Sequence, residues 1–189
     1  MLLATACGQQ TDDRVDTTDT ASVDSLQSEV AAATPFVTVD CTSLQVMPVD
    51  APPDGTTVGA VTAIFQPNGA PAITVATDAT PATELGVADI SVGTGAEVAP
   101  GMSVTANYCG VGLGTKAVFD SSWTRGEPAT FPLDGVIAGW QEGLVGMKVG
   151  GQRLLVIPSD LGYGDSGTPD GSIPPGETLV FVVQLEDAS

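Results

Sequence analysis

The stretch 136–144, VIAGWQEGL, carries the clearest helical pattern in the chain. Its apolar side chains fall on one face of a helix, at Val136, Ile137, Trp140 and Leu144. The pattern predicts a short amphipathic helix that begins after Asp134, which could cap it, and ends at Gly146. The helix carries one of the two tryptophans of the chain. The apolar face of the helix must be buried against a sheet, because neither the apolar face of the helix nor that of the sheet is stable in water.

Most of the surrounding sequence predicts strands and turns. Alternating or continuous apolar residues indicate strands, which we place at 86–92, 104–111, 116–122, 152–158 and 178–185. Glycine and proline mark turns at 93–95 and 98–102. Antiparallel strands with one short helix make an α+β domain, which we expect to occupy residues 85–189. On residue type alone, Trp140 is better explained as an ordinary core residue.

The segment 36–84 is harder to interpret. Residues 36–39 alternate and predict a short strand, and residues 50–55 predict a turn or linker. Residues 58–75 combine β-branched residues with prolines and an Asn-Gly pair, which predicts loose strands and turns. We expect an N-terminal extension with short strands, whose function the sequence does not indicate.

The composition excludes several classes of function. The chain has a net charge of -18 and only five basic residues. Nucleic acid is therefore not an expected partner, because phosphate contacts need clustered lysine and arginine. The chain contains no histidine, which excludes the usual Ser-His-Asp and Cys-His arrangements and imidazole metal sites. We expect neither a metal nor a cofactor.

The three cysteines, Cys7, Cys41 and Cys109, lack zinc-site spacing. Residues 1–7 resemble the remnant of a bacterial lipoprotein signal, in which the cysteine is lipidated, so we expect a lipid on Cys7. A cytosolic protein with a chance cysteine is the alternative. In an exported protein Cys41 and Cys109 would be the remaining pair, either joined as a disulfide or present as free thiols.

Residues 8–35 are rich in Thr, Asp, Ser, Gln and Ala and contain no aromatic residue. Such a segment has little apolar surface to bury, so it predicts a disordered acidic linker between a lipid anchor and a folded domain. A faint helical pattern over residues 23–30 is the alternative.

Several short motifs in the second half of the chain resemble the FKBP-type peptidyl-prolyl cis-trans isomerases. Each motif alone is weak, but their order and spacing are close to those of the family. They lie at 93–95 (GTG), 108–110 (YCG), 119–122 (FDSS), 136–144, 147–150, 158–164, 173–175 (IPP) and 178–183. The resemblance covers residues 85–189 and implies a twisted antiparallel sheet wrapped around one short helix.

The resemblance also implies an apolar, bowl-shaped site with Trp140 as its floor. It assigns catalytic roles to Tyr108, Phe119, Asp120, Tyr163 and Phe181. It assigns substrate binding to Arg125, Phe131, Val136, Ile137, Trp140 and Ile173. The phenol of Tyr163 would donate a hydrogen bond to a ligand carbonyl. Taken alone, Phe119 and Phe181 are also consistent with plain core residues, Asp120 with a turn residue and Arg125 with a surface charge.

Three positions depart from the pattern of the family. Thr168 stands near the position where many members of the family have histidine, and Leu161 stands where many have tyrosine. Ala129 replaces an aromatic residue at the rim of the site. These departures would widen the mouth of the site. They would weaken macrolide binding or change the preferred residue before proline.

The function implied by the resemblance is cis-trans isomerisation of Xaa-Pro bonds in exported proteins. The expected partners are proline-containing polypeptides and rapamycin-type macrolides, with contact to a membrane only through the lipid on Cys7. We expect a monomer anchored outside the cytoplasm. The alternatives are a module or chaperone that binds proline-containing segments with little turnover, and a structural lipoprotein with a degenerate site.

Overall fold

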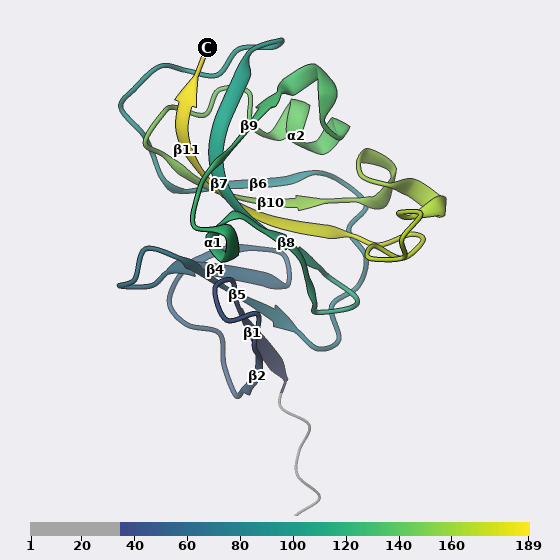
Figure 1. The fold of residues 1–189 in the computed structure, drawn as a ribbon. Coiled ribbons are helices and arrows are strands. Elements are labelled where there is room, and N and C mark those ends of the chain that lie inside the picture. The colour runs from purple at the N-terminus through teal and green to yellow at the C-terminus, as the bar shows by residue number, and fades with distance from the viewer. Residues whose placement is uncertain (1–34) are drawn as a thin grey trace, which may run out of the picture. The chain divides into compact units, whose positions relative to one another are not determined.

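The computed structural model describes residues 35–189, which form one compact unit with two antiparallel sheets (Figure 1). The predicted signal remnant at 1–7, with Cys7, and almost all of the predicted linker at 8–35 lie outside the described residues. Within the described residues, no helix is long and apolar enough to cross a membrane.

The N-terminal sheet has five strands in the order β2-β1-β5-β4-β3. Its strands are β1 (Phe36–Asp40), β2 (Val46–Val49), β3 (Thr56–Val58), β4 (Val61–Phe65) and β5 (Pro71–Ala76). The two prolines lie where a missing N–H is tolerated: Pro48 is on the edge strand β2, and Pro71 is the first residue of β5. The strands and turns predicted over 58–75 are present, and β-branched residues there build a regular sheet with a buried central strand.

The turn between β1 and β2 is held by one carboxylate. Asp40 Oδ1 accepts hydrogen bonds from the backbone N–H groups of Ser43 (2.8 Å) and Thr42 (2.9 Å), and Oδ2 accepts one from Gln66 Nε2 (3.0 Å). These bonds, chiefly the one from Ser43, hold the pKa of the Asp40 carboxyl well below its usual value. The ionised form of Asp40 therefore stabilises this turn.

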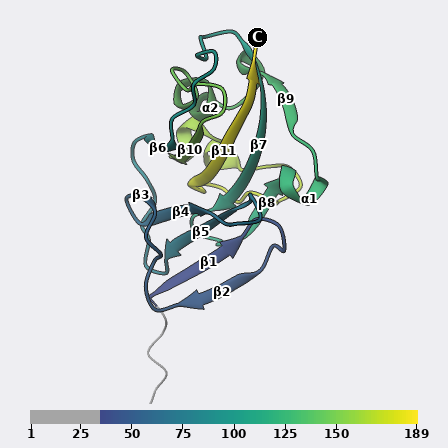
Figure 2. The same ribbon diagram turned by 90° about the vertical axis from the view of Figure 1, so that its left-hand side faces the viewer.

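The C-terminal sheet follows the order β6-β10-β11-β7-β8, and β9 pairs with β7 (Figures 1 and 2). Its strands are β6 (Gly86–Ser91), β7 (Ser103–Gly112), β8 (Val118–Ser121), β9 (Ala129–Pro132), β10 (Gln152–Ile157) and β11 (Leu179–Ala188). The helical segments are α1 (Ser122–Arg125), η2 (Leu133–Gly135), α2 (Ala138–Gly143), η3 (Ser159–Leu161) and η4 (Gly164–Ser166). The predicted strands are present, whereas α1 and β9 were not predicted.

The central strands of this sheet are buried on both faces. Along β10, Leu155 and Ile157 face the cluster around α2, whereas Leu154 and Val156 face the N-terminal sheet. Successive side chains of a strand point to opposite faces, so a strand covered on both sides needs a continuous apolar run. The N-terminal sheet thus forms a second core with the face of the C-terminal sheet opposite α2.

Helix α2 is shorter than predicted. The structure starts it at Ala138, with Ile137 as the N-cap residue in an extended conformation, and no side chain caps it. The expected cap by Asp134 is wrong, because Asp134 lies in the preceding 3-10 turn. A Cβ atom on Gly139 would lie 2.3 Å from Ile157 Cγ2, and one on Gly143 would lie 2.8 Å from Leu155 Cδ2. These glycines therefore allow the helix to approach β10 closely.

Arg153 fastens the end of this helix to the sheet. It is almost fully buried, and its Nη1 donates to the carbonyl oxygen of Gly143 (2.8 Å). Its Nε and Nη2 donate to the two carboxylate oxygens of Asp89 on β6 (2.7 and 3.2 Å). The Arg153 guanidinium thus binds a carbonyl at the end of the helix, and the Asp89 carboxylate neutralises the buried charge of Arg153. This fixes α2, and with it Trp140, over the sheet.

Candidate active site

A cavity of about 630 Å³ opens on the side of the C-terminal sheet that α2 covers. It is lined by Tyr108, Phe119, Asp120, Phe131, Gly135, Val136, Ile137, Trp140, Tyr163, Thr168, Ser172, Ile173 and Phe181. Every residue to which the resemblance assigns catalysis or substrate binding, except Arg125, lines this cavity, and Arg125 contacts two of the lining residues. Side chains from β7, β8, β9, β11 and α2 therefore meet at one place.

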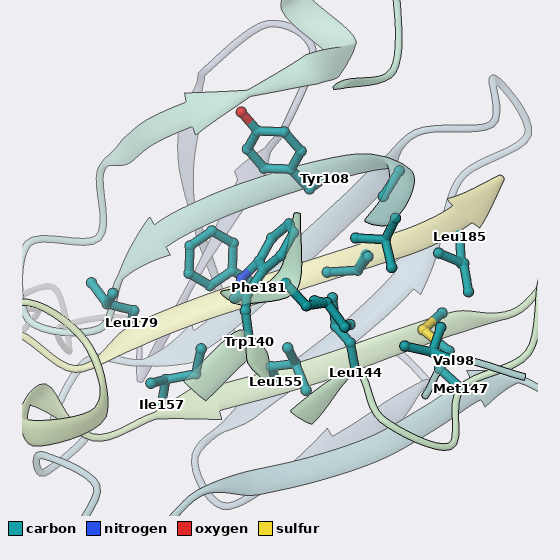
Figure 3. Close-up of a cluster of buried hydrophobic side chains, with 14 of the residues drawn as sticks. Val98, Tyr108, Trp140, Leu144, Met147, Leu155, Ile157, Leu179, Phe181 and Leu185 are labelled. Atoms are coloured by element: carbon teal, nitrogen blue, oxygen red, sulfur yellow. The ribbon is translucent and has the colours of Figure 1, made fainter. Parts of the chain in front are cut away.

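The floor of the cavity is Trp140, which is buried and contacts three other aromatic rings. Figure 3 shows Trp140 among the buried side chains with two of these, Tyr108 and Phe181. Its ring centroid lies 5.5 Å from that of Tyr108, 5.5 Å from Phe131 and 5.3 Å from Phe181, with the rings nearly perpendicular. Edge-to-face pairs at these distances are favourable beyond the area they bury. Phe119 extends the wall by a similar contact with Phe181 (5.4 Å).

One polar atom lies in this aromatic floor. Trp140 Nε1 is buried and has no hydrogen-bond partner among residues 35–189. Buried indole N–H groups usually find a partner. The indole therefore contributes to the protein through its shape and its aromatic contacts, and not through a hydrogen bond.

The charged groups of the site lie in one corner, the polar corner, which consists of Tyr108, Asp120 and Arg125. The Tyr108 hydroxyl donates to Asp120 Oδ2, Arg125 Nη2 donates to the Tyr108 oxygen (2.7 Å), and Arg125 Nη1 donates to Asp120 Oδ1 (2.5 Å). The Asp120 and Arg125 side chains are 42% and 43% exposed. An ion pair this exposed adds only about 0–1 kcal/mol of stability, so the fold does not depend on it.

The protonation of Tyr108 follows from this corner. Burial raises the pKa of its phenol above the usual value, the hydrogen bond to Asp120 raises it further, and the bond from Arg125 opposes both effects. Tyr108 therefore keeps its proton at neutral pH and donates a hydrogen bond to Asp120. Its hydroxyl is committed within the protein and is not free to donate to a ligand.

Ser122, at the start of α1, joins the polar corner to β7. Its hydroxyl accepts a hydrogen bond from the Tyr108 backbone N–H (2.9 Å) and donates one to Asn107 Oδ1 (3.1 Å). Ser122 is completely buried. We did not predict this role, although the motif at 119–122 contains the residue; a serine two residues after a site carboxylate was the available signal.

The loop between β10 and β11 forms the opposite rim. Thr168 and Ile173 close it, with the Thr168 N–H donating to the Ile173 carbonyl and the Ile173 N–H donating to Thr168 Oγ1, both at 2.9 Å. Ile173 is buried against the cavity, whereas Tyr163 is 41% exposed. The Tyr163 phenol makes no hydrogen bond with another residue in the described part of the chain, so it is available to a ligand.

Two lining residues, Gly135 and Ser172, were not predicted, and Ala129, which was predicted at the rim of the site, is not among the lining residues. Ala129 lies on β9 opposite Ala106 and packs against the core cluster. The register of β9, which was not predicted, places it there. No cluster of three or more potential metal ligands occurs among residues 35–189.

Cys41 and Cys109, which we considered either bonded or free, are joined by a disulfide with a Cα–Cα distance of 6.0 Å. Cys109 lies next to Tyr108 on β7, and Cys41 follows β1. The bond therefore links the N-terminal sheet to the strand that carries one residue of the polar corner.

Comparison with known proteins finds one family. The sequence profile of FKBP-type peptidyl-prolyl cis-trans isomerases matches residues 95–186. A probable FK506-binding protein of Corynebacterium glutamicum is 53% identical over 107 residues, which cover 56% of this chain and 87% of that protein.

Two crystal structures are similar to this chain. FkpA from Escherichia coli is 46% identical with a TM-score of 0.52, and the match covers 59% of this chain and 51% of that structure. A peptidyl-prolyl cis-trans isomerase from Pseudomonas syringae is 35% identical with a TM-score of 0.52, and the match covers 58% of this chain and 78% of that structure. The strands of the N-terminal sheet all precede the residues that match the profile.

Proposed function

This chain belongs to the family of FKBP-type peptidyl-prolyl cis-trans isomerases and has their activity, and we propose that it catalyses the reaction in the aromatic cavity above Trp140. The observation that carries the assignment is the arrangement of the cavity. Three aromatic rings surround the apolar floor that Trp140 forms, and the charged groups are confined to one corner.

The reaction needs no proton transfer to or from carbon and no covalent intermediate. Rotation about an Xaa-Pro bond is slow because it must break amide resonance, with a barrier of roughly 18–20 kcal/mol. The planar amide has more charge separation than the twisted transition state. An apolar cavity therefore destabilises the planar form more than the twisted form, which is the difference in binding that catalysis requires.

We assign separate tasks to the lining residues. The proline ring packs on Trp140 and against Phe119 and Phe181, where it is removed from water. The free phenol of Tyr163 donates a hydrogen bond to a carbonyl oxygen of the substrate and orients it. The polar corner, in which Asp120 holds Tyr108 and Arg125, keeps the adjacent wall in place and faces the polar side of the twisted amide.

The test is the cis-to-trans rate of a short Xaa-Pro peptide in an assay without a coupling protease. The wild-type chain should accelerate the reaction, and rapamycin should abolish the acceleration by occupying the cavity. Tyr163→Phe and Trp140→Ala should lower kcat/KM. Val46→Ala, an exposed substitution on the edge strand β2, is the matched control and should not change it. If the folded wild-type chain binds proline peptides without accelerating isomerisation, the chain is a binding module and the proposed mechanism fails.

We further propose that the substrates are exported proteins and that the chain is a monomer held at the outer face of the cell membrane by a lipid on Cys7. The lipoprotein-like start and the disulfide between Cys41 and Cys109, a bond typical of oxidising compartments, support this. Mass spectrometry of the protein from its own membrane fraction should find an acyl group on Cys7. Cys7→Ser should release the protein from membranes, and an unmodified Cys7 in the membrane fraction would contradict the anchor.

A further inference from the structure

The segment 120–125 carries two residues of the polar corner, Asp120 and Arg125, and its other side contacts the N-terminal sheet. Within this segment, the Ser121 hydroxyl donates to the backbone carbonyl of Cys41 (2.8 Å, buried). The Trp123 ring packs edge-on against Phe65, with ring centroids 6.0 Å apart. Both views of the fold show α1 and β8 next to the N-terminal sheet (Figures 1 and 2).

The disulfide adds a third connection at the neighbouring strand. Cys109 lies opposite Ser121 in the β7–β8 ladder and directly follows Tyr108 in sequence. Cys41 therefore contacts both sides of this ladder, through its sulfur to Cys109 and through its carbonyl oxygen to Ser121. All three residues of the polar corner are thus one or two residues from a contact with Cys41 or Phe65.

Strand β8 and Ser122 are held to β7 by the strand ladder and by the hydrogen bonds of Ser122, but helix α1 beyond them has little support of its own. Helix α1 has only four residues, too few for a stable isolated helix. Its N-cap residue, Ser121, makes no side-chain capping bond, because its hydroxyl is committed to Cys41 instead. Arg125, at the end of α1, is 43% exposed, so its position depends on its bonds to Asp120 and Tyr108 more than on packing around its side chain.

We propose that the N-terminal sheet positions the polar corner of the active site, with Cys41 and Phe65 as the positioning residues. This inference rests on the proposed role of Asp120 and Arg125 in the site. Catalytic groups lose efficiency when they are displaced by about 1 Å, so loosening a remote support lowers the rate without removing any group that touches the substrate. The extension is therefore part of the isomerase machinery and more than a spacer.

The test is a double-mutant cycle on the full-length chain. Phe65→Leu removes the aromatic contact with Trp123 and keeps an apolar side chain. We expect it to lower kcat/KM about fivefold in the wild-type background and less than about twofold in the Arg125→Gln background, because the guanidinium it positions is gone. Val75→Ala, a buried residue on the central strand β5, is the matched control; it should lower stability and leave kcat/KM unchanged.

The cycle separates this inference from the proposed site. If Phe65→Leu lowers kcat/KM by the same factor in both backgrounds, it does not act through Arg125 and the inference is wrong. If Arg125→Gln alone has no effect, the proposed role of the polar corner fails. Positioning is then judged from the ¹H–¹⁵N side-chain signal of Arg125, one of three arginines in the chain with Arg14 and Arg153.

That signal reports the contact directly. We expect Phe65→Leu, and independently Ser121→Ala, to shift or broaden the Arg125 Nε–H resonance and to leave that of Arg153 in place. Ser121→Ala removes the hydrogen bond to Cys41 without creating a large cavity, so it provides the measurement if Phe65→Leu does not fold. An unchanged Arg125 signal in a folded variant would overturn the inference.

Discussion

Replacing Trp140 tests the fold and the mechanism together. Trp140 is the floor of the cavity and also the residue through which α2 packs on the aromatic side chains of the C-terminal sheet. Two substitutions separate these roles. Trp140→Ala removes the ring, whereas Trp140→Phe keeps an aromatic ring and removes the indole N–H, which has no partner among residues 35–189.

The size of the effect follows from the contacts. Loss of a buried tryptophan side chain to alanine costs about 3–5 kcal/mol. The edge-to-face pairs with Tyr108, Phe131 and Phe181 explain much of this loss, at about 0.5–1.5 kcal/mol each. Trp140→Phe should cost less than about 1.5 kcal/mol, because most of the volume remains and no hydrogen bond is broken.

The assays are urea unfolding and the uncoupled peptide assay, run on the same samples. For Trp140→Ala we expect kcat/KM to fall about 10- to 100-fold, equivalent to about 1.4–2.7 kcal/mol of transition-state stabilisation. For Trp140→Phe we expect a change of less than about threefold, because the floor stays apolar.

The refuting result is specific. If Trp140→Phe retains its stability and loses as much kcat/KM as Trp140→Ala, the indole N–H acts on the substrate. The explanation of catalysis by an apolar floor would then be wrong. If instead Trp140→Ala keeps full activity in a folded sample, the substrate does not bind at this cavity.

Three other predictions concern the disulfide, the acid side of the stability curve and the free phenol. Replacing both Cys41 and Cys109 by alanine should lower the free energy of unfolding by about 4 kcal/mol, because the bond closes a loop with a sequence separation of 68; a loss under about 1 kcal/mol in urea titrations would contradict this. The pKa of Asp40 is lowered in the folded state. Its contribution to the free energy of unfolding is therefore fully present when the pH is above the ordinary pKa of 3.8, and it is lost as the pH falls through and below that value. Asp40→Asn should therefore be less stable than wild type at pH 6 and lose less stability on acidification. If the unfolding free energies of the variant and the wild type change in parallel with pH, the ionised Asp40 carboxylate does not stabilise the fold. Tyr163→Phe should lower kcat/KM about tenfold and leave the unfolding free energy within about 0.5 kcal/mol of wild type, since the phenol is exposed. A loss of unfolding free energy as large as the loss of transition-state stabilisation would mean that the residue supports the loop instead.

The helix illustrates how far local sequence can be used. The pattern at 136–144 correctly indicates a short helix with Trp140 on its buried face. The pattern did not locate the start of the helix, because Val136 and Ile137 are apolar for a different reason. They line the cavity from the extended segment before the helix. Apolar spacing reports that a residue is covered, but not by which element.

The N-terminal sheet shows a signal that was present and not used. The runs at 154–157 (LLVI) and 179–183 (LVFVV) are continuously apolar, which is typical of strands covered on both faces. One short helix can cover only one face, so a second layer was implied. The segment 36–84 was the part of the chain available to form it, although its prolines and glycines concealed the strands.

The sequence by itself determined the family, the aromatic residues of the site and the helix that carries its floor, because short motifs in a fixed order depend on local spacing. Only the tertiary structure decided that Arg125 binds both Asp120 and Tyr108, that Cys41 meets Cys109, and that Phe65 lies against Trp123. These contacts join residues far apart in the chain, or depend on where a long side chain turns. They are set by the register and packing of two sheets, which no local pattern specifies.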